Sequence, residues 1–277
     1  MENKEANRID LEAAINAHSK KKVPRFVLRY MKKIVHEQAM NDFIFDPKTP
    51  SGKGFFQASL DFFGMKYKIK GANNMPPADH PVIFACTHPL GGPESLLLGA
   101  YLVERYGDAF QVPVNSLLSF VKPLKDFFVP VNVLGGRQTR DIGARLATMF
   151  ETKMHVLVFP SGKCARKQGR VVVEEPWKKM FVAQAKRYHR DVVPVHCSGH
   201  NSRRFYVLSK ISDFLGLKIN LGMFYLADEL FKQKGNTMTL TFGEPVPWET
   251  FDSSKKDIEW AAYVREKAIH LPEIIKE

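Results

Sequence analysis

Apolar and polar residues along most of this chain follow two periods, which predict strands and helices in turn. Short segments of apolar or alternating character predict strands at 66–70, 81–86, 111–115, 129–133, 154–159, 191–196 and 237–242. Between them, apolar positions recur every three or four residues, which predicts helices near 55–63, 94–106, 117–127, 138–151, 176–190, 202–216, 221–232 and 256–270. This alternation favours an α/β fold with a mixed, largely parallel sheet flanked by helices. Active residues are then expected in loops that follow strand ends.

The N-terminal part predicts a helical extension of a different character. A helix at 8–18 precedes a stretch that holds no acidic residue between Ser19 and His36, and Pro24 suits the first turn of a second helix. Its basic residues are Lys20, Lys21, Lys22, Arg25, Arg29, Lys32 and Lys33. A basic amphipathic helix is typical of a membrane-surface element attracted to anionic lipid. The same periodicity also fits a helix packed on the domain with a solvated basic face.

Residues 46–54 are rich in proline and glycine and predict a linker. The linker divides the chain into a basic amphipathic helical segment, 1–45, and a main domain, 46–277. No internal repeat is visible in the sequence.

The composition of the chain indicates what kind of partner the protein binds and in which compartment it is found. The chain has 277 residues, 44% of them hydrophobic, and a formal net charge of +12, which indicates an anionic partner such as a membrane surface, a phosphate-bearing substrate or nucleic acid. Its three cysteines form no CxxC pair, so we expect reduced thiols in a cytosolic compartment. Neither a signal peptide nor an apolar run of about 20 residues is present, so we expect any membrane contact to be peripheral.

The most concentrated chemistry lies in the loop after the strand predicted at 81–86. His88-Pro-Leu-Gly-Gly-Pro-Glu94 places a histidine at a strand end and a carboxylate at a helix start. An imidazole titrates near neutral pH, and a carboxylate on its far nitrogen fixes the tautomer and raises its basicity. The loop therefore suggests a general base, His88, oriented by Glu94. The same spacing is also compatible with Glu94 favouring a helix N-terminus and His88 ending a strand.

Further blocks follow in the chain and carry a family resemblance. They are Phe128–Val133 with Gly135, Gly136 and Arg137, then Phe159–Lys167, then Val192–Val195. With the His88–Glu94 loop, and in this order, they resemble the PlsC-like glycerolipid acyltransferases. The resemblance is closer to a bacterial hemolysin-like branch with a His-Pro-Leu-Gly-Gly-x-Asp block, which includes O-acyltransferases of glycine lipids. Here Glu94 stands where that branch usually has Asp.

The resemblance implies an enzyme of lipid biosynthesis at the cytoplasmic face of the inner membrane. It would transfer a fatty acyl group from acyl-carrier protein or coenzyme A, as co-substrate and without a further cofactor, to the hydroxyl of a lyso-lipid. His88 would act as the base, and loop amides near Gly91, Gly92 or Gly162 would stabilise the oxyanion. The acceptor implied is a glycine-type lyso-lipid, and the alternative is a lysophosphatidate that becomes phosphatidate.

The third block differs from that of the glycerol-phosphate users at the position where those enzymes carry Glu, which is Ser161 here. Its cations Lys163, Arg166 and Lys167 follow a buried strand and suit a phosphate or carboxylate, with Gly162 beside them. Arg137 in the second block suits an anion as well. The alternatives are a basic solvated loop for the third block and, for Arg137, an ion pair with an acid on the next helix.

A lipid hydrolase is the rival enzyme class. Cys86 lies two residues before His88, so both would point to one side of a strand, although a small buried thiol is the plainer interpretation. Ser161 is not part of a GxSxG elbow, because Phe159 takes the first glycine position. The histidines show no HExxH spacing and no nucleic-acid-binding motif is recognised, so we assign no metal and no nucleic-acid partner.

Overall fold

The computed structural model of the chain describes residues 8–18, 23–116, 118, 121–131, 140–214, 222 and 225–276. A central sheet has the strand order β1-β9-β8-β2-β5-β3-β4. Its strands are β1 (Lys66–Lys70), β2 (Ile83–Cys86), β3 (Phe110–Asn115), β4 (Phe128–Val131), β5 (His155–Val158), β8 (Val192–Cys197) and β9 (Thr237–Phe242). β8, β2, β5, β3 and β4 run parallel, whereas β9 pairs antiparallel with β8 and parallel with β1. The predicted α/β class with a mixed, largely parallel sheet is confirmed.

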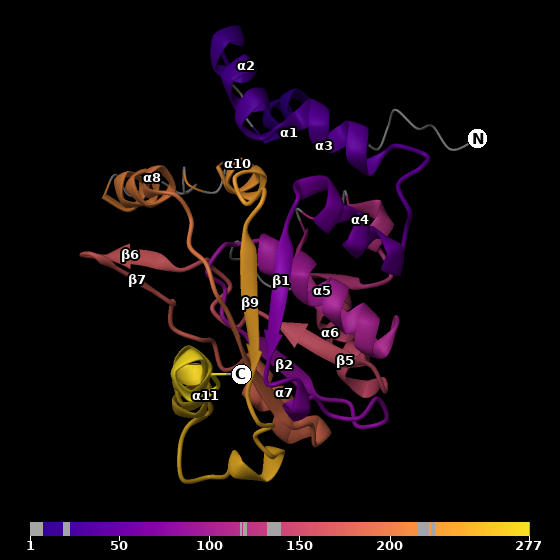
Figure 1. The fold of residues 1–277 in the computed structure, drawn as a ribbon, viewed down its shortest axis with the longest axis vertical. Helices are drawn as coiled ribbons and strands as arrows, with labels where there is room; N and C mark the ends of the chain where they lie inside the picture. The colour runs from indigo at the N-terminus through magenta and orange to yellow at the C-terminus, as the bar shows by residue number, and fades with distance from the viewer. Residues whose placement is uncertain are drawn as a thin grey trace.

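Helices cover both faces of this sheet (Figure 1). α4 (Lys53–Phe63) and α5 (Pro93–Tyr106) pack on one face, and α6 (Arg140–Glu151), α7 (Met180–Tyr188) and α11 (Asp257–Ile274) on the other. The fully buried strand β2 shows why, because its side chains alternate between the two cores. Phe84 and Cys86 join the core under α4 and α5, while Ile83 and Ala85 join the core under α7 and α11.

Close packing fixes the helix that begins at the His88–Glu94 loop. A Cβ atom built on Gly99 of α5 would lie 2.1 Å from Cε1 of the Phe56 ring on α4, so only glycine fits there. The Phe56 ring in turn packs edge-on against Phe127 at 5.1 Å. These contacts fix how closely α5 approaches α4.

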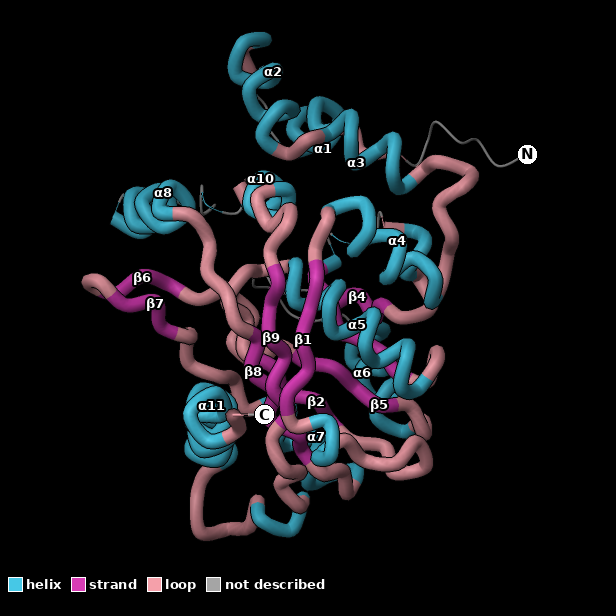
Figure 2. The backbone as a smooth tube through the Cα atoms, in the orientation of Figure 1, coloured by secondary structure: helices cyan, strands magenta, loops and turns pink. Residues whose placement is uncertain are grey.

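The carboxyl ends of β2, β5 and β8 meet at one edge of the sheet, and the remaining elements lie beyond that edge (Figures 1 and 2). They are α8 (Arg203–Phe214), α10 (Leu226–Phe231), a hairpin of β6 (Arg166–Gln168) and β7 (Val171–Val173), and α1 (Leu11–His18), α2 (Arg25–Ile34) and α3 (Glu37–Ile44). Short 3-10 turns complete the elements at Ala72–Asn74, Lys122–Leu124 and Trp248–Thr250. None of the described helices is both long and apolar enough to cross a bilayer.

Several predicted elements differ from the structure. In the described part of the helix predicted at 117–127, the chain forms 3-10 structure at Leu118 and at Lys122–Leu124 and no α-helix; Pro123 cannot donate the main-chain hydrogen bond that an α-helix would need there. The helix predicted at 176–190 is shorter and spans Met180–Tyr188. The β6–β7 hairpin was not predicted, since its strands lack apolar alternation.

The basic helix predicted after Pro24 ends at Ile34, although the helical spacing of its apolar side runs on through Val35 to Gln38 in the sequence. His36 adopts a left-handed conformation, with φ of 50°, and separates α2 from α3. Its ring stacks on Phe231 of α10 at 4.0 Å, so a tertiary contact accompanies the break. Lys20, Lys21 and Lys22 lie outside the described residues. The division of the chain at residue 46 stays a prediction.

Candidate active site

His88 lies just beyond the end of β2, and Glu94 is the second residue of α5. The His88 Nδ1 atom lies 2.9 Å from Oε1 of Glu94, whose side chain is fully buried. The approach is close but oblique, because Nδ1 makes no well-directed hydrogen bond to any described residue. Nε2 has no hydrogen-bond partner among the described residues either, and the imidazole keeps 17% of its surface exposed. One ring nitrogen thus lies next to a carboxylate, while the other makes no hydrogen bond to the residues that the structure describes.

The loop between them is wrapped around the Glu94 carboxylate. Oε1 accepts the main-chain N–H groups of Leu90 and Gly91, and Oε2 accepts that of Gly92, each at 3.0 Å. Gly91 has φ of +87°, and a Cβ there would lie 2.8 Å from Cδ2 of Leu226. Glycine is therefore required at Gly91 for both backbone conformation and space.

The loop amides expected to stabilise an oxyanion have partners within the protein. The N–H groups of Gly91 and Gly92 are engaged by Glu94, and that of Gly162 donates to the carbonyl of Phe159 at 3.0 Å. The physical reason is that a fully buried carboxylate requires donors, and the loop supplies the nearest ones. In this structure these three amides are not available to an oxyanion.

Electrostatics favours the charged form of both partners. Burial would lower the pKa of His88, but the adjacent Glu94 carboxylate and the nearby Glu174 outweigh burial and raise it above 6.5. Burial would likewise raise the pKa of Glu94, but the His88 charge and the main-chain donors lower it below 4.5. A base with a raised pKa next to a fixed carboxylate can accept a proton from a hydroxyl and hold it.

The third block lies directly beside the first. The main-chain N–H of Ala165 donates to the carbonyl of His88 at 2.9 Å, and the Phe159 ring lies 4.6 Å from the imidazole. Ser161 is buried and donates its hydroxyl to the carbonyl of Lys163 at 2.9 Å. Two blocks that are distant in the sequence are thus in contact at one edge of the sheet.

The cations of the third block differ in position. The Lys163 side chain is exposed, and Arg166 and Lys167 are half-buried on β6. Arg166 donates from Nη1 to the Cys164 thiol at 3.4 Å, and Cys164 lies against Gly91. Arg166 is therefore the cation of this block that the contacts connect to the His88–Glu94 loop. Arg137 lies outside the described residues.

Two residues next to the loop were not identified from the sequence. Glu174, 9% exposed after β7, accepts the main-chain N–H of His88 on both oxygens, at 3.2 and 3.1 Å. Asn201 after β8 is 1% exposed and donates from Nδ2 to the carbonyl of Leu90 at 3.0 Å. Neither belongs to a motif, although Glu174 ends an acid-free stretch that begins after Glu151.

The thiol beside the loop has no features of a nucleophile. Cys86 is fully buried in the core, and burial raises its pKa well above 9.0, so the thiolate is not populated at neutral pH. In the part of the chain that is described, no group of three or more His, Cys, Asp or Glu side chains is placed to hold a metal.

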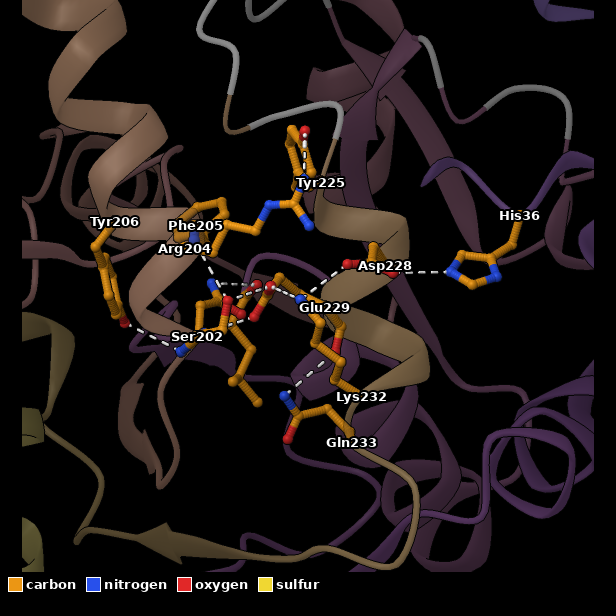
Figure 3. Close-up of polar contacts among 12 residues, drawn as sticks. His36, Ser202, Arg204, Phe205, Tyr206, Tyr225, Asp228, Glu229, Lys232 and Gln233 are labelled. Atoms are coloured by element: carbon orange, nitrogen blue, oxygen red, sulfur yellow. Dashed lines mark hydrogen bonds and ion pairs between the residues drawn. The ribbon is translucent and has the colours of Figure 1, made fainter. Parts of the chain in front are cut away.

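A polar network joins this edge to the N-terminal helices (Figure 3). Glu229 of α10, 1% exposed, accepts the main-chain N–H and the hydroxyl of Ser202, at 2.5 and 2.6 Å. Lys232 lies 2.7 Å from Glu229 and 2.8 Å from Asp228, and Asp228 contacts Nε2 of His36 at 3.0 Å. Because Ser202 follows Asn201, the network links the α2–α3 junction to the His88–Glu94 loop through successive contacts.

Comparison with known proteins identifies the family. A model of the acyltransferase family matches residues 11–276. A lyso-glycine lipid O-acyltransferase of Phocaeicola vulgatus is 40% identical over 261 residues, 93% of each chain, and one of Bacteroides thetaiotaomicron is 38% identical over 93% of this chain and 95% of its own. A crystal structure of the 1-acyl-sn-glycerophosphate acyltransferase PlsC of Thermotoga maritima matches with a TM-score of 0.45 and 18% identity, over 91% of this chain and 84% of that one. The chain belongs to the acyltransferase family.

Proposed function

We propose that this acyltransferase moves a fatty acyl group from an acyl thioester to the hydroxyl of a lyso-lipid, with His88 as general base. One observation carries the assignment. Nδ1 of His88 is held 2.9 Å from a fully buried carboxylate, and Nε2 has no partner among the described residues. This is the arrangement that makes a hydroxyl nucleophilic without a covalent enzyme intermediate.

The step balances with the residues present. The acceptor hydroxyl oxygen forms a bond to the thioester carbonyl carbon while Nε2 of His88 takes the hydroxyl proton. The C–S bond then breaks, and the sulfur leaves as a thiol that carries the proton from the imidazolium. Between these events the imidazolium is stabilised by Glu94, which stays ionised because its pKa is lowered.

The acceptor we propose is a glycine-type lyso-lipid, such as an N-(3-hydroxyacyl)glycine. Support comes from the two relatives, which are named lyso-glycine lipid O-acyltransferases. The carboxylate of such an acceptor requires a cation near the base, and Arg166 is suited to this role. Its guanidinium donates a hydrogen bond to the Cys164 thiol and lies over the Phe205 ring. It has no carboxylate partner in the described part of the chain. Lysophosphatidate, whose phosphate suits the same cation, is the competing acceptor.

We also propose that the protein docks on an anionic membrane, at the cytoplasmic face of the inner membrane, through α2 and α8. Phe26 and Tyr30 of α2 are 76% and 48% exposed, and Val207 and Ile211 of α8 are 46% and 42% exposed. Exposed cations flank them, namely Arg25, Arg29, Lys33, Arg203 and Lys210. A hydrogen bond of 2.6 Å from Arg204 to the Tyr30 hydroxyl joins the two helices. Apolar tips among basic residues suit an anionic interface.

A competition assay tests the acceptor. Purified protein receives one acyl thioester, as either acyl-carrier protein or coenzyme A conjugate, with equal lysophosphatidate and N-(3-hydroxyacyl)glycine. We expect the O-acylated glycine lipid to dominate. Arg166→Gln should then raise KM for the glycine lipid about 10- to 100-fold, since a hydrogen bond to a charged group contributes about 1.5–3 kcal/mol.

Arg105→Gln is the matched control, because Arg105 is exposed at the far end of α5 from Glu94. It should leave KM unchanged. A product pool dominated by phosphatidate would reject the glycine-lipid acceptor and leave the His88 chemistry in place. Equal effects of the two arginine substitutions would reject Arg166 as the carboxylate partner.

A further inference from the structure

His88 is flanked by a second buried carboxylate besides Glu94. Glu174 follows β7 at the base of the β6–β7 hairpin and is 9% exposed. Both of its oxygens accept the main-chain N–H of His88, at 3.2 and 3.1 Å, and Oε1 also accepts the indole N–H of Trp177 at 3.0 Å. The contact between Glu174 and His88 spans 86 positions of the sequence, so only the fold creates it.

An ionised carboxylate at Glu174 would reduce folding stability. Burial raises its pKa, and no lysine or arginine side chain described in the structure forms an ion pair with it. A buried charge without a cation destabilises a fold, and a neutral amide could accept the same two N–H groups. These hydrogen bonds alone therefore do not require a glutamate rather than a glutamine at position 174.

The surroundings of Glu174 hold it rigidly. Arg265 of α11 donates to the main-chain carbonyls of Glu174 and Glu175, which fixes the segment from behind. The carboxylate itself faces His88, Trp177 and the Ser161 hydroxyl. A rigid acceptor at the His88 main chain sets where the imidazole leaves the end of β2.

We propose that Glu174 is a positioning residue for His88, which anchors its main chain and stabilises the imidazolium that forms during transfer. The proposal rests on the proposed role of His88 as base. Among the residues that the structure describes, the charged groups that face His88 are Glu94 from α5 and Glu174 after β7. The thiols of Cys86, Cys164 and Cys197 lie nearby and stay protonated, because burial raises the pKa of each.

Glu174→Gln tests the charge, because glutamine keeps an acceptor for His88 and Trp177 and removes the negative charge. We expect the pKa of His88 to fall by about one unit, the size of shift that one nearby charge produces. The acid limb of kcat/KM should move to lower pH by the same amount, and kcat should fall by about tenfold. The His88 pKa is read from the imidazole proton signals in NMR spectra, assigned by comparison with His88→Ala.

Two further variants separate charge from structure. Trp177→Phe removes the other donor to the same carboxylate. It should lower Tm and move the His88 pKa by much less than Glu174→Gln, because the carboxylate itself is kept. Glu174→Asp keeps the charge on a shorter side chain and should lower kcat while the acid limb stays close to that of the wild type. It also serves as the comparison if Glu174→Gln fails to fold.

An unchanged His88 pKa in folded Glu174→Gln would overturn the proposal, and so would an equal shift in Trp177→Phe. If Glu174→Gln does not fold, Glu174→Asp takes its place. An acid limb of kcat/KM that moves in Glu174→Asp by the amount expected for loss of the charge would also overturn the proposal. The NMR titration needs no acyl transfer, so it stays informative if the proposed reaction is wrong. Conversely, if the wild type transfers the acyl group and the His88 pKa is unchanged in Glu174→Gln, only this inference is rejected and the proposed function stands.

Discussion

Replacing Glu94 with glutamine tests the orienting carboxylate directly. The side chain is fully buried and receives three main-chain N–H groups besides the His88 contact. In Glu94→Gln the amide oxygen can keep the donors on Oε1, but the NH2 group then faces the N–H of Gly92. Leaving one buried donor unsatisfied costs about 1–3 kcal/mol of folding stability.

The catalytic loss comes from the missing charge. The imidazolium formed by proton transfer loses its partner 2.9 Å away, and general-base assistance of this kind contributes about 100-fold, or about 2.7 kcal/mol of barrier. Since the Glu94 carboxylate raises the pKa of His88, that pKa should fall in the variant. The acid limb of kcat/KM should then move to lower pH.

Stability should depend on pH in a related way. The pKa of Glu94 is lowered from 4.5 in the fold, so its charge adds stability above pH 4.5 that is lost as the pH falls through the folded value. The pKa of His88 is raised from 6.5, so its share is fully present below pH 6.5 and is lost as the pH rises through the raised value. The stability difference between wild type and Glu94→Gln should therefore be largest between these limits.

The assay follows thiol release from an acyl thioester from about pH 5 to pH 9, a range that brackets the histidine limb, together with thermal unfolding. Glu229→Gln is the matched control, because Glu229 is also buried and accepts a main-chain N–H but does not face His88. It should lower Tm and leave the acid limb in place. A folded Glu94→Gln protein with near wild-type kcat and an unmoved limb would refute the dyad.

Two further outcomes follow from burial and exposure. Cys86→Ala should keep full transfer activity and lose about 1 kcal/mol or more of unfolding free energy, because a buried side chain is truncated; loss of transfer without unfolding would restore the thiol as nucleophile. Arg25→Glu with Arg29→Glu should weaken sedimentation with phosphatidylglycerol vesicles by at least about 1 kcal/mol per charge, an effect that added salt reduces. The matched control is Lys267→Glu of α11 with Lys255→Glu just before that helix, and α11 lies far from α2 (Figure 1); equal loss in both pairs would reject docking through α2.

The fold was predictable where burial is uniform. The run before His88 is apolar because β2 is covered on both faces. A buried strand could therefore be predicted there without tertiary information. Prediction failed where local and tertiary preferences compete. The periodicity of α2 continues past His36, but contacts of that ring with Phe231 and Asp228 accompany a left-handed turn that no local pattern signals.

The site was predictable only within its own loop. His88 and Glu94 are six positions apart, so the strand end and helix start could place them together. Asn201 reaches the loop across 111 positions and Glu174 across 86. Contacts of that separation depend on the order β8-β2-β5 in the sheet, which the alternation of elements does not specify.

The length of the acidic side chain explains why the loop can be built from this sequence. Glu94 sits one residue inside α5, after Pro93, and its side chain reaches back to Nδ1 of His88. A carboxylate at that place also enters a ring of three N–H groups, which requires the loop to fold around it and requires glycine at position 91. The N–H groups of Gly91 and Gly92 therefore bind the Glu94 carboxylate. Any stabilisation of the oxyanion must come from donors other than these amides, or from a loop conformation that releases them from Glu94.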